Sequence, residues 1–226
     1  MIDSPERVPA SAANTPTYVP PKRAANRNPH RHQAGGGIGN LLATVIVLLV
    51  APVVALVMTT YVFQSYEVDG SSMETTLSNK DRLLIWKVPK TLSRLTQHPY
   101  TPNRGDIIVF SENLLSSYGQ VTGKQLVKRV IGLPGEHVIV KNGTVTVYNS
   151  EQPEGFEPDK TLPYGDVITA TTSGNVDIIV PVDSVFVLGD NRSNSLDSRT
   201  FGPVPDKNVV GKLAVRVWPA QKMQLF

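Results

Sequence analysis

The sequence predicts a mainly β protein: an antiparallel, barrel-like β domain preceded by one transmembrane α-helix. Two observations lead to this prediction. An apolar segment without charged residues runs from Leu41 to Phe63. After it, short segments rich in Val, Ile and aromatic residues alternate with Gly, Pro, Asn and Asp, as strands and turns do. No later segment keeps the 3.6-residue apolar period of a core-facing helix over about twelve residues.

Residues 1–37 differ in composition from the rest of the chain. Prolines are scattered among alanine, asparagine and polar residues, and three consecutive glycines end the segment. Because there is no apolar period to bury, we expect a disordered tail. Its five Lys or Arg and two Asp or Glu account for the whole net charge of +3, so the tail is basic and the rest of the chain is neutral. A neutral body lacks the positive face that binds a phosphate backbone, and a nucleic-acid partner is not expected.

Residues 38–63 are predicted to form the transmembrane helix. Leu41–Phe63 would make a helix of roughly 34 Å, which is long enough to cross a lipid bilayer. A cleaved signal peptide would have a shorter apolar region nearer the N-terminus, and a buried helix of a soluble protein would normally have a polar face. Membrane helices tolerate a proline such as Pro52. The positive-inside rule then keeps the tail in the cytoplasm and places residues 64–226 outside it, in a single-pass protein of the cell membrane.

The third part, residues 64–226, is predicted to consist of strands. Asn142–Gly143 lies between two of them and is a strong hairpin signal. The expected strands are Arg82–Val88, Asp106–Phe110, Gln125–Ile131, His137–Val140, Thr144–Tyr148, Val176–Val180, Ser184–Leu188 and Leu213–Trp218.

Composition excludes several kinds of chemistry. The chain has no cysteine, so thiol enzymes, Cys-ligated metal sites and disulfides are ruled out. Only four histidines occur, two of them in the tail, and neither glycine-rich phosphate-binding pattern is present. We therefore expect no metal site and no cofactor.

Ser72 lies in a Gly-Ser-Ser segment just beyond the predicted span. If residues 65–72 are extended, strand alternation places Tyr66, Val68, Gly70 and Ser72 on one face, so that an apolar groove leads to the hydroxyl. Gly and Ser clusters are also ordinary turn formers, and the segment alone does not decide between a turn and a reactive site.

Lys128 lies inside an apolar strand, on the same face as Leu126 and Val130. Burial would disfavour its charged form and lower its pKa, and a neutral amine can accept a proton. The alternative is an exposed strand lysine whose head stays in water.

The polar loop 189–199 follows another apolar strand. Its Asn, Asp and Ser side chains can form local turns, and Asp197 could pair with Arg199. A simple solvated loop is the alternative. A triad of Ser72, His137 and either Asp190 or Asp197 also stays open, because such triads are defined by geometry and not by sequence order.

Together and in this order, these segments resemble bacterial type I signal peptidases, the membrane-anchored serine–lysine proteases that remove signal peptides from exported proteins. The resemblance covers roughly Leu41 to Val217. The matching motifs are Gly70-Ser71-Ser72-Met73-x-x-Thr76-Leu77, Arg104-Gly105-Asp106, Lys128-Arg129-Val130-Ile131-Gly132-Leu133-Pro134-Gly135 and Gly189-Asp190-Asn191-Arg192-x-Asn194-Ser195-x-Asp197-Ser198-Arg199-x-x-Gly202-x-Val204-Pro205.

The resemblance implies a role for each matched residue. Ser72 would be the nucleophile, Lys128 the general base and Ser195 the residue that orients the lysine. The backbone N–H of Ser72 would help to form the oxyanion hole. The positions read as structural support are Arg129, Asp190, Asp197 and Arg199.

The chain departs from many relatives at two positions. Thr75 stands where they have proline, and Gly70 stands where some have a serine that acts as a second oxyanion donor. The second donor is therefore unassigned. The segment 136–186 is short, which implies a small inserted β subdomain.

The substrates implied by the resemblance are preproteins with small side chains at the first and third positions before the cut. The signal-peptide end could add as a strand beside residues 65–71. The expected groove residues are Tyr66, Val68, Leu77 and Val127. The lipid bilayer is a further expected partner, and the secretion translocon is a candidate one.

Two other functions stay open at this point. One is a related serine–lysine peptidase with a narrow client. The other is a membrane-anchored module that binds extended peptides without cutting them. A self-cleaving repressor is disfavoured, because nothing before residue 64 resembles a DNA-binding domain.

Overall fold

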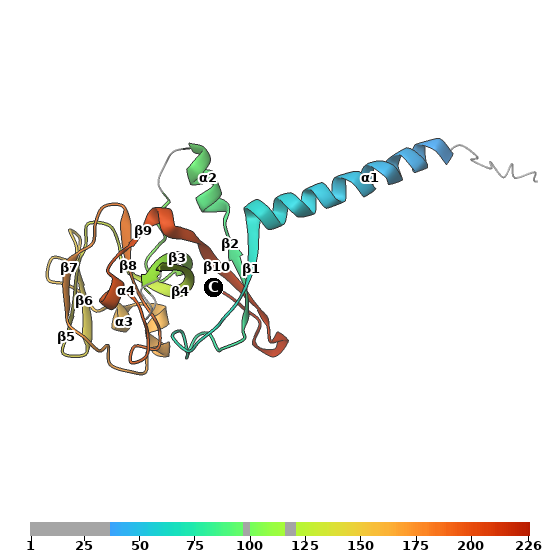
Figure 1. Ribbon diagram of the computed structural model, residues 1–226. Helices are drawn as coiled ribbons and strands as arrows, with labels where there is room; N and C mark the ends of the chain where they lie inside the picture. Colours follow the sequence, from blue (N-terminus) through green and yellow to red (C-terminus); the bar gives the residue numbers. More distant parts are fainter. Residues whose placement is uncertain (1–36, 97–99, 116–120) are drawn as a thin grey trace, which may run out of the picture. The chain divides into compact units, whose positions relative to one another are not determined.

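A computed structural model describes residues 37–96, 100–115 and 121–226 (Figure 1). The tail expected at residues 1–37 lies outside the described residues, apart from Gly37. The chain divides into two compact units, and the boundary between them falls after Val45, inside the first helix. The whole β structure belongs to the second unit.

One long apolar helix precedes the β structure. α1 covers Gly37–Val57, contains Pro52 and continues as a π-helical turn, η1, over Met58–Val62. Leu41–Val62 is long and apolar enough to cross a membrane. The helical segment therefore ends one residue before the predicted boundary, since Phe63 already starts the first strand.

The larger sheet has eight strands in the order β1-β2-β10-β3-β4-β8-β9, with β11 paired to β10, and its pairings are antiparallel. Within the described residues β1 and β9 do not pair with each other, so the sheet is an open path rather than a closed barrel. Its strands are β1 (Phe63–Glu67), β2 (Arg82–Trp86), β3 (Ile107–Leu115), β4 (Val121–Gly132), β8 (Ser184–Leu188), β9 (Val204–Pro205), β10 (Val209–Trp218) and β11 (Gln224–Leu225).

A second, three-stranded sheet has the order β6-β5-β7, formed by β5 (His137–Lys141), β6 (Thr144–Tyr148) and β7 (Val176–Ile179). In Figure 1 these strands stand beside the larger sheet, on the side away from β1. Asn142 and Gly143 join β5 to β6, and both have positive φ, 52° and 84°. Two positive φ angles are what a type I′ hairpin turn requires, and the hairpin predicted from this Asn-Gly pair is confirmed.

Short helices fill the connections. They are α2 (Val88–Thr96), α3 (Pro158–Thr161), η2 (Pro163–Val167), α4 (Ser198–Phe201), η3 (Asp206–Asn208) and η4 (Ala220–Lys222). α2 corrects one prediction: the strand expected to reach Val88 ends at Trp86, and Val88 starts a helix. Pro89 favours this change, because proline fits the first turn of a helix and donates no ladder hydrogen bond to a strand.

The apolar side chains form three buried clusters. One lies beneath the segment that carries Ser72 and consists of Val68, Met73, Leu77, Leu83, Ile85, Ile107, Val109 and Leu213. The second joins the small sheet to β8, and the third lies among β3, β4, β8 and β10. The prediction of a mainly antiparallel β protein with one N-terminal apolar helix is confirmed.

Candidate active site

Ser72 lies in a tight turn after β1. Residues 72–76 form this turn, and the N–H of Leu77 donates to the carbonyl oxygen of Met73 at 2.7 Å. Met73 and Leu77 are both buried in the first core cluster and fix the turn to the domain. Of the two conformations that the sequence left open for this segment, Ser72 adopts the turn and not the extended strand. The strand ends at Glu67, because burying both apolar side chains requires the chain to turn.

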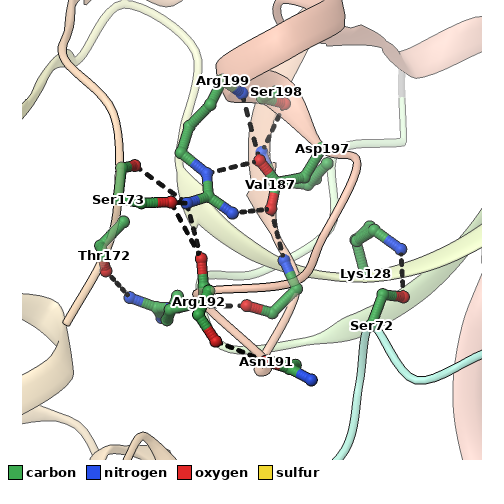
Figure 2. Close-up of polar contacts among 12 residues, drawn as sticks. Ser72, Lys128, Thr172, Ser173, Val187, Asn191, Arg192, Asp197, Ser198 and Arg199 are labelled. Carbon is green, nitrogen blue, oxygen red and sulfur yellow. Dashed lines mark hydrogen bonds and ion pairs between the residues drawn. The ribbon is translucent and has the colours of Figure 1, made fainter. Parts of the chain in front are cut away.

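β4 supplies the group that faces Ser72. Nζ of Lys128 lies 2.7 Å from Oγ of Ser72 and donates a further hydrogen bond to the carbonyl oxygen of Val127 at 2.9 Å. Figure 2 shows the two side chains facing each other from separate segments. The sequence separates them by more than fifty positions, and the pairing of β4 with β3 and β8 fixes the lysine in place.

Lys128 is buried, with only 2% of the residue exposed. Burial lowers the pKa of its amine to about 8, an effect that the nearby carboxylates of Asp197 and Asp190 partly oppose. The alternative that Lys128 is an exposed strand residue with its amine in water is therefore excluded. Near pH 8 a large fraction of the amine is neutral and can take a proton from a hydroxyl at hydrogen-bonding distance.

The loop after β8 holds the Ser72 turn from the other side. The backbone N–H of Asn191 donates to the carbonyl oxygen of Ser72 at 3.1 Å, and its side-chain amide donates to the carbonyl oxygen of Ser71 at 3.1 Å. The side-chain amide of Asn194 donates to Oγ of Ser71 at 3.0 Å. Sequence reasoning assigned no role to these two asparagines. The only available signal was their place in a loop dense with side chains that form Asx turns.

Ser195 lies against the same turn. A Cβ atom added to Gly189 would lie 2.2 Å from Oγ of Ser195 and 2.4 Å from the carbonyl oxygen of Ser72, so the three residues are in close contact. The Ser195 hydroxyl oxygen is buried and has no hydrogen-bond partner among the described residues. The structure thus brings Ser195 beside Ser72 without a hydrogen bond to Lys128.

Arg129 and Asp190 form a buried, bidentate ion pair behind the Ser72 turn. Nε and Nη2 of Arg129 donate to the two carboxylate oxygens of Asp190 at 2.8 and 2.6 Å. The hydroxyl of Thr76 donates to Asp190 at 2.5 Å, and Arg129 also donates to the carbonyl oxygen of Gly105. The guanidinium lies 4.6 Å from the ring centre of Tyr164. Each charge is therefore matched by several partners, as buried charges require.

Asp197 and Arg199 form a second bidentate pair, which confirms the expected contact (Figure 2). Asp197 also accepts the backbone N–H of Gly189 at 3.0 Å, and Arg199 donates to the carbonyl oxygen of Arg192 at 2.8 Å. Arg192 itself is fully buried and pairs with Asp159 of α3. Its burial was not foreseen, because an arginine in a polar loop usually lies in solvent.

A cavity of about 310 Å³ opens beside Ser72 and Lys128. Its walls are the segment from Tyr66 to Ser72 and the β4 residues Lys124–Lys128. Three of the expected groove residues, Tyr66, Val68 and Val127, line this cavity. The fourth does not, because Leu77 is completely buried in the core cluster beneath.

His137 lies elsewhere. Its Nε2 is 2.7 Å from the carboxylate of Asp177, on the strand that neighbours β5 in the small sheet. The basic group at the serine hydroxyl is the lysine. The triad of Ser72, His137 and an aspartate, which the sequence left open, is therefore not formed.

Comparisons with known proteins agree on one family. The family described as signal peptidase, peptidase S26, matches residues 41–218. The chain is 32% identical to Signal peptidase I of Leptolyngbya laminosa over 95% of each chain. It is 37% identical to Probable signal peptidase I-1 of Synechocystis sp., over 77% of this chain and 81% of the relative. It is 31% identical to Signal peptidase IB of Staphylococcus aureus, over 79% of this chain and 90% of the relative.

Proposed function

The chain belongs to the signal peptidase family, peptidase S26, and from this premise we propose that it cuts signal peptides from exported preproteins with Ser72 as nucleophile and Lys128 as general base. Membership makes the chain a serine peptidase, a hydrolase that acts on preprotein signal peptides. The observation that carries the assignment of the two residues is the distance of 2.7 Å between Nζ of the buried Lys128 and Oγ of Ser72.

The reaction begins with neutral Lys128. Its amine takes the hydroxyl proton of Ser72 while Oγ attacks the carbonyl carbon at the cut, and a tetrahedral intermediate forms. The intermediate collapses to an acyl-enzyme when the lysine gives its proton to the leaving amine of the mature protein. Water then gives a proton to the neutral amine of Lys128 and attacks the ester carbonyl. When the ester bond breaks, the lysine returns this proton to Oγ of Ser72, which releases the signal peptide and restores the hydroxyl.

The backbone N–H of Ser72 is the proposed donor to the oxyanion. Within the part of the chain that the structure describes, no hydrogen bond uses this N–H, so it is available to the developing negative charge. Gly70 has no hydroxyl and adds no side-chain donor. A donor that is already fixed costs little reorganisation during the reaction, which favours a donor in a rigid turn.

The cavity between β1 and β4 is the proposed substrate groove. Among the described residues β1 pairs only with β2, and residues 124–128 of β4 pair only with β3, so both strands have an unpaired edge toward the cavity. An extended signal-peptide end can add its backbone to such edges. Small side chains before the cut would then meet the walls formed by Tyr66, Val68 and Val127.

The surrounding residues would hold Ser72 and Lys128 at their hydrogen-bonding distance. We assign Arg129 with Asp190, and Asp197 with Arg199, to fixing the loop 189–199 against the Ser72 turn. Ser195 would orient the amine of Lys128. The support for this role is the closeness of Ser195 to the Ser72 turn; among the described residues its hydroxyl makes no hydrogen bond.

The proposal includes membrane topology and domain organisation. Residues 1–37 would be the cytoplasmic tail, 38–63 the span, and 64–226 the extracytoplasmic catalytic domain with 136–186 as a small inserted subdomain. The apolar helix Leu41–Val62 and the basic tail before it support this orientation.

Cleavage of a preprotein with an Ala-x-Ala site by the purified full chain tests the proposal. We expect a single cut after that site, abolished by Ser72→Ala and reduced at least about 1,000-fold by Lys128→Ala. His137→Ala is the matched control and should keep full activity, since His137 contacts Asp177 instead. Wild-type rates in the folded Lys128→Ala variant would overturn the assignment of the base. No cut by the folded wild type would overturn the function.

Several unrelated preproteins in the same assay distinguish a general signal peptidase from a peptidase with one client. Cleavage of most of them supports the general enzyme. The non-catalytic peptide-binding module is set aside, because the family consists of serine peptidases.

A further inference from the structure

Helix α2 presents its apolar side to the outside. Val88, Leu92 and Leu95 are spaced four and three residues apart and therefore share one face of the helix. Leu92 and Leu95 are 55% and 78% exposed. In a soluble domain such a face would pack against the core, so its exposure needs a partner outside the domain.

α2 is attached to the last turn of the apolar helical segment. The hydroxyl of Thr91 donates to the carbonyl oxygen of Tyr61 at 3.0 Å, and Nζ of Lys87, directly before α2, donates to the carbonyl oxygen of Thr60 at 2.7 Å. Both carbonyls belong to η1, where Leu41–Val62 ends. If this segment spans the bilayer, α2 lies at the depth where the hydrocarbon meets the lipid headgroups.

A basic pocket of about 260 Å³ adjoins α2. Its lining includes the cationic side chains Lys87, Lys90, Arg94 and Lys207, and no Asp or Glu. Among the residues that the structure describes, none of these four cations forms an ion pair with a carboxylate. The pocket therefore combines concentrated positive charge with an exposed apolar helix face.

The close spacing of positive charges in the pocket affects Lys90. Its Nζ donates to the backbone carbonyl oxygen of Asp206 at 2.6 Å. Burial and the neighbouring charge of Arg94 lower the pKa of Lys90, and the carboxylate of Asp206 offsets this only in part. An added anion in the pocket would relieve the repulsion.

We propose that α2 lies in the membrane interface, with Leu92 and Leu95 among the acyl chains, and that the adjoining basic pocket binds the phosphate of an anionic phospholipid. The inference rests on the proposed membrane span. Charge complementarity selects a lipid with net negative charge over a zwitterionic one, because the pocket has no carboxylate to pair with a cationic headgroup. The apolar face selects a lipid over free phosphate, because a free ion leaves Leu92 and Leu95 exposed to water.

The position of α2 can be measured with a single spin label, since the chain has no cysteine of its own. Leu95→Cys would carry the label in the full chain reconstituted in vesicles of about three parts phosphatidylcholine to one part phosphatidylglycerol. Ile179→Cys is the matched control, because Ile179 is also strongly exposed, at 68%, but lies on β7 of the small sheet, on the side of the domain away from β1 (Figure 1).

We expect the label at position 95 to be relaxed more by oxygen than by a water-soluble nickel chelate, and the label at position 179 to show the reverse. Equal nickel accessibility at the two positions would overturn the interfacial position of α2. Two further measurements keep the outcomes apart. Flotation of the protein with the vesicles shows whether the chain is inserted in the membrane, and cleavage of a soluble preprotein in detergent shows whether it is an active peptidase.

The basic pocket is tested by lipid retention. Native mass spectrometry of protein extracted from the same vesicles should show phosphatidylglycerol enriched several-fold over phosphatidylcholine. Lys90→Gln with Arg94→Gln should remove most of this enrichment, while the exposed pair Lys141→Gln with Lys160→Gln should leave it unchanged. Equal retention of both lipids by the wild type would overturn the headgroup site. Displacement of the retained lipid by millimolar inorganic phosphate would assign the pocket to free phosphate instead, against the proposal.

Discussion

Gly189 and Ser195 are in direct contact beside the Ser72 turn, and no side chain larger than hydrogen fits at position 189. A Cβ atom there would come within 2.2 Å of Oγ of Ser195 and 2.4 Å of the carbonyl oxygen of Ser72. A rotation of the Ser195 side chain would not relieve this, because the added atom would also lie 2.6 Å from Cβ of Ser195, and the contact on Ser72 is with backbone.

Gly189→Ala is therefore expected to displace the nucleophile turn. We predict loss of most preprotein cleavage together with destabilisation by about 1–3 kcal/mol, as is usual when a packed site is overfilled. Gly123→Ala is the control for the same change, because a Cβ atom there would meet its nearest neighbour only at 3.7 Å. Unaltered kcat in Gly189→Ala would show that the turn can move without consequence.

The pH dependence of cleavage should follow the protonation of Lys128, whose pKa burial lowers to about 8. Since the reaction needs the neutral amine, kcat/KM should rise about tenfold per pH unit below that value and level off above it. Lys124 is a like charge that lowers the same pKa. Lys124→Gln lets Lys128 hold its proton to higher pH, so the profile should move toward alkaline pH. A profile that is flat from about pH 6 to about pH 9 contradicts a lysine base.

The buried pair of Arg129 and Asp190 should matter for stability. Asp190→Ala leaves the Arg129 guanidinium buried without its carboxylate, and the expected loss is about 3–5 kcal/mol in the free energy of unfolding. Denaturant unfolding of the full chain in detergent measures this loss. Glu67→Ala breaks the exposed pair with Lys80 and should change the midpoint little. Similar midpoints for the two variants would contradict the structural role given to Asp190.

Thr75 has a φ of 87°, in the left-handed region that β-branched residues disfavour. Thr75→Gly should therefore stabilise the protein, by about 1 kcal/mol, whereas Thr75→Pro should destabilise it because proline fixes φ near −65°. Unfolding midpoints of both variants check the sign. Thr144→Gly, in strand β6, is the matched control and should lower stability. Stabilisation by Thr75→Pro would mean that the turn is free to adopt another conformation.

Much of the fold could be predicted from local patterns. A strand overlaps each of the eight predicted segments, because short apolar segments between turn residues indicate both an extended backbone and burial. α2 was missed because it has only nine residues and keeps its apolar face outside, so the preceding strand pattern appeared to continue through Val88. The local pattern could not decide between a strand and a turn at Ser72, because the turn depends on tertiary packing: the first core cluster takes up Met73 and Leu77.

The candidate site was less accessible to sequence reasoning. Strand alternation could argue that Lys128 is buried, but no local pattern joins it to Ser72, and only the ordered resemblance to a family did so. The hydrogen bonds from Asn191 to the backbone of Ser71 and Ser72 depend on how the loop folds over the turn. Leu77 was expected in the groove, whereas its side chain is buried in the core.

The site is assembled from three segments that leave the ribosome at different times. Ser72 is made first and Lys128 second, and the loop that contacts the backbone of Ser72 through Asn191 is made after both. Before that loop has been made, the hydrogen bonds by which Asn191 holds the backbone of Ser71 and Ser72 cannot form. The complete site can therefore form only after residues 189–199 have left the ribosome.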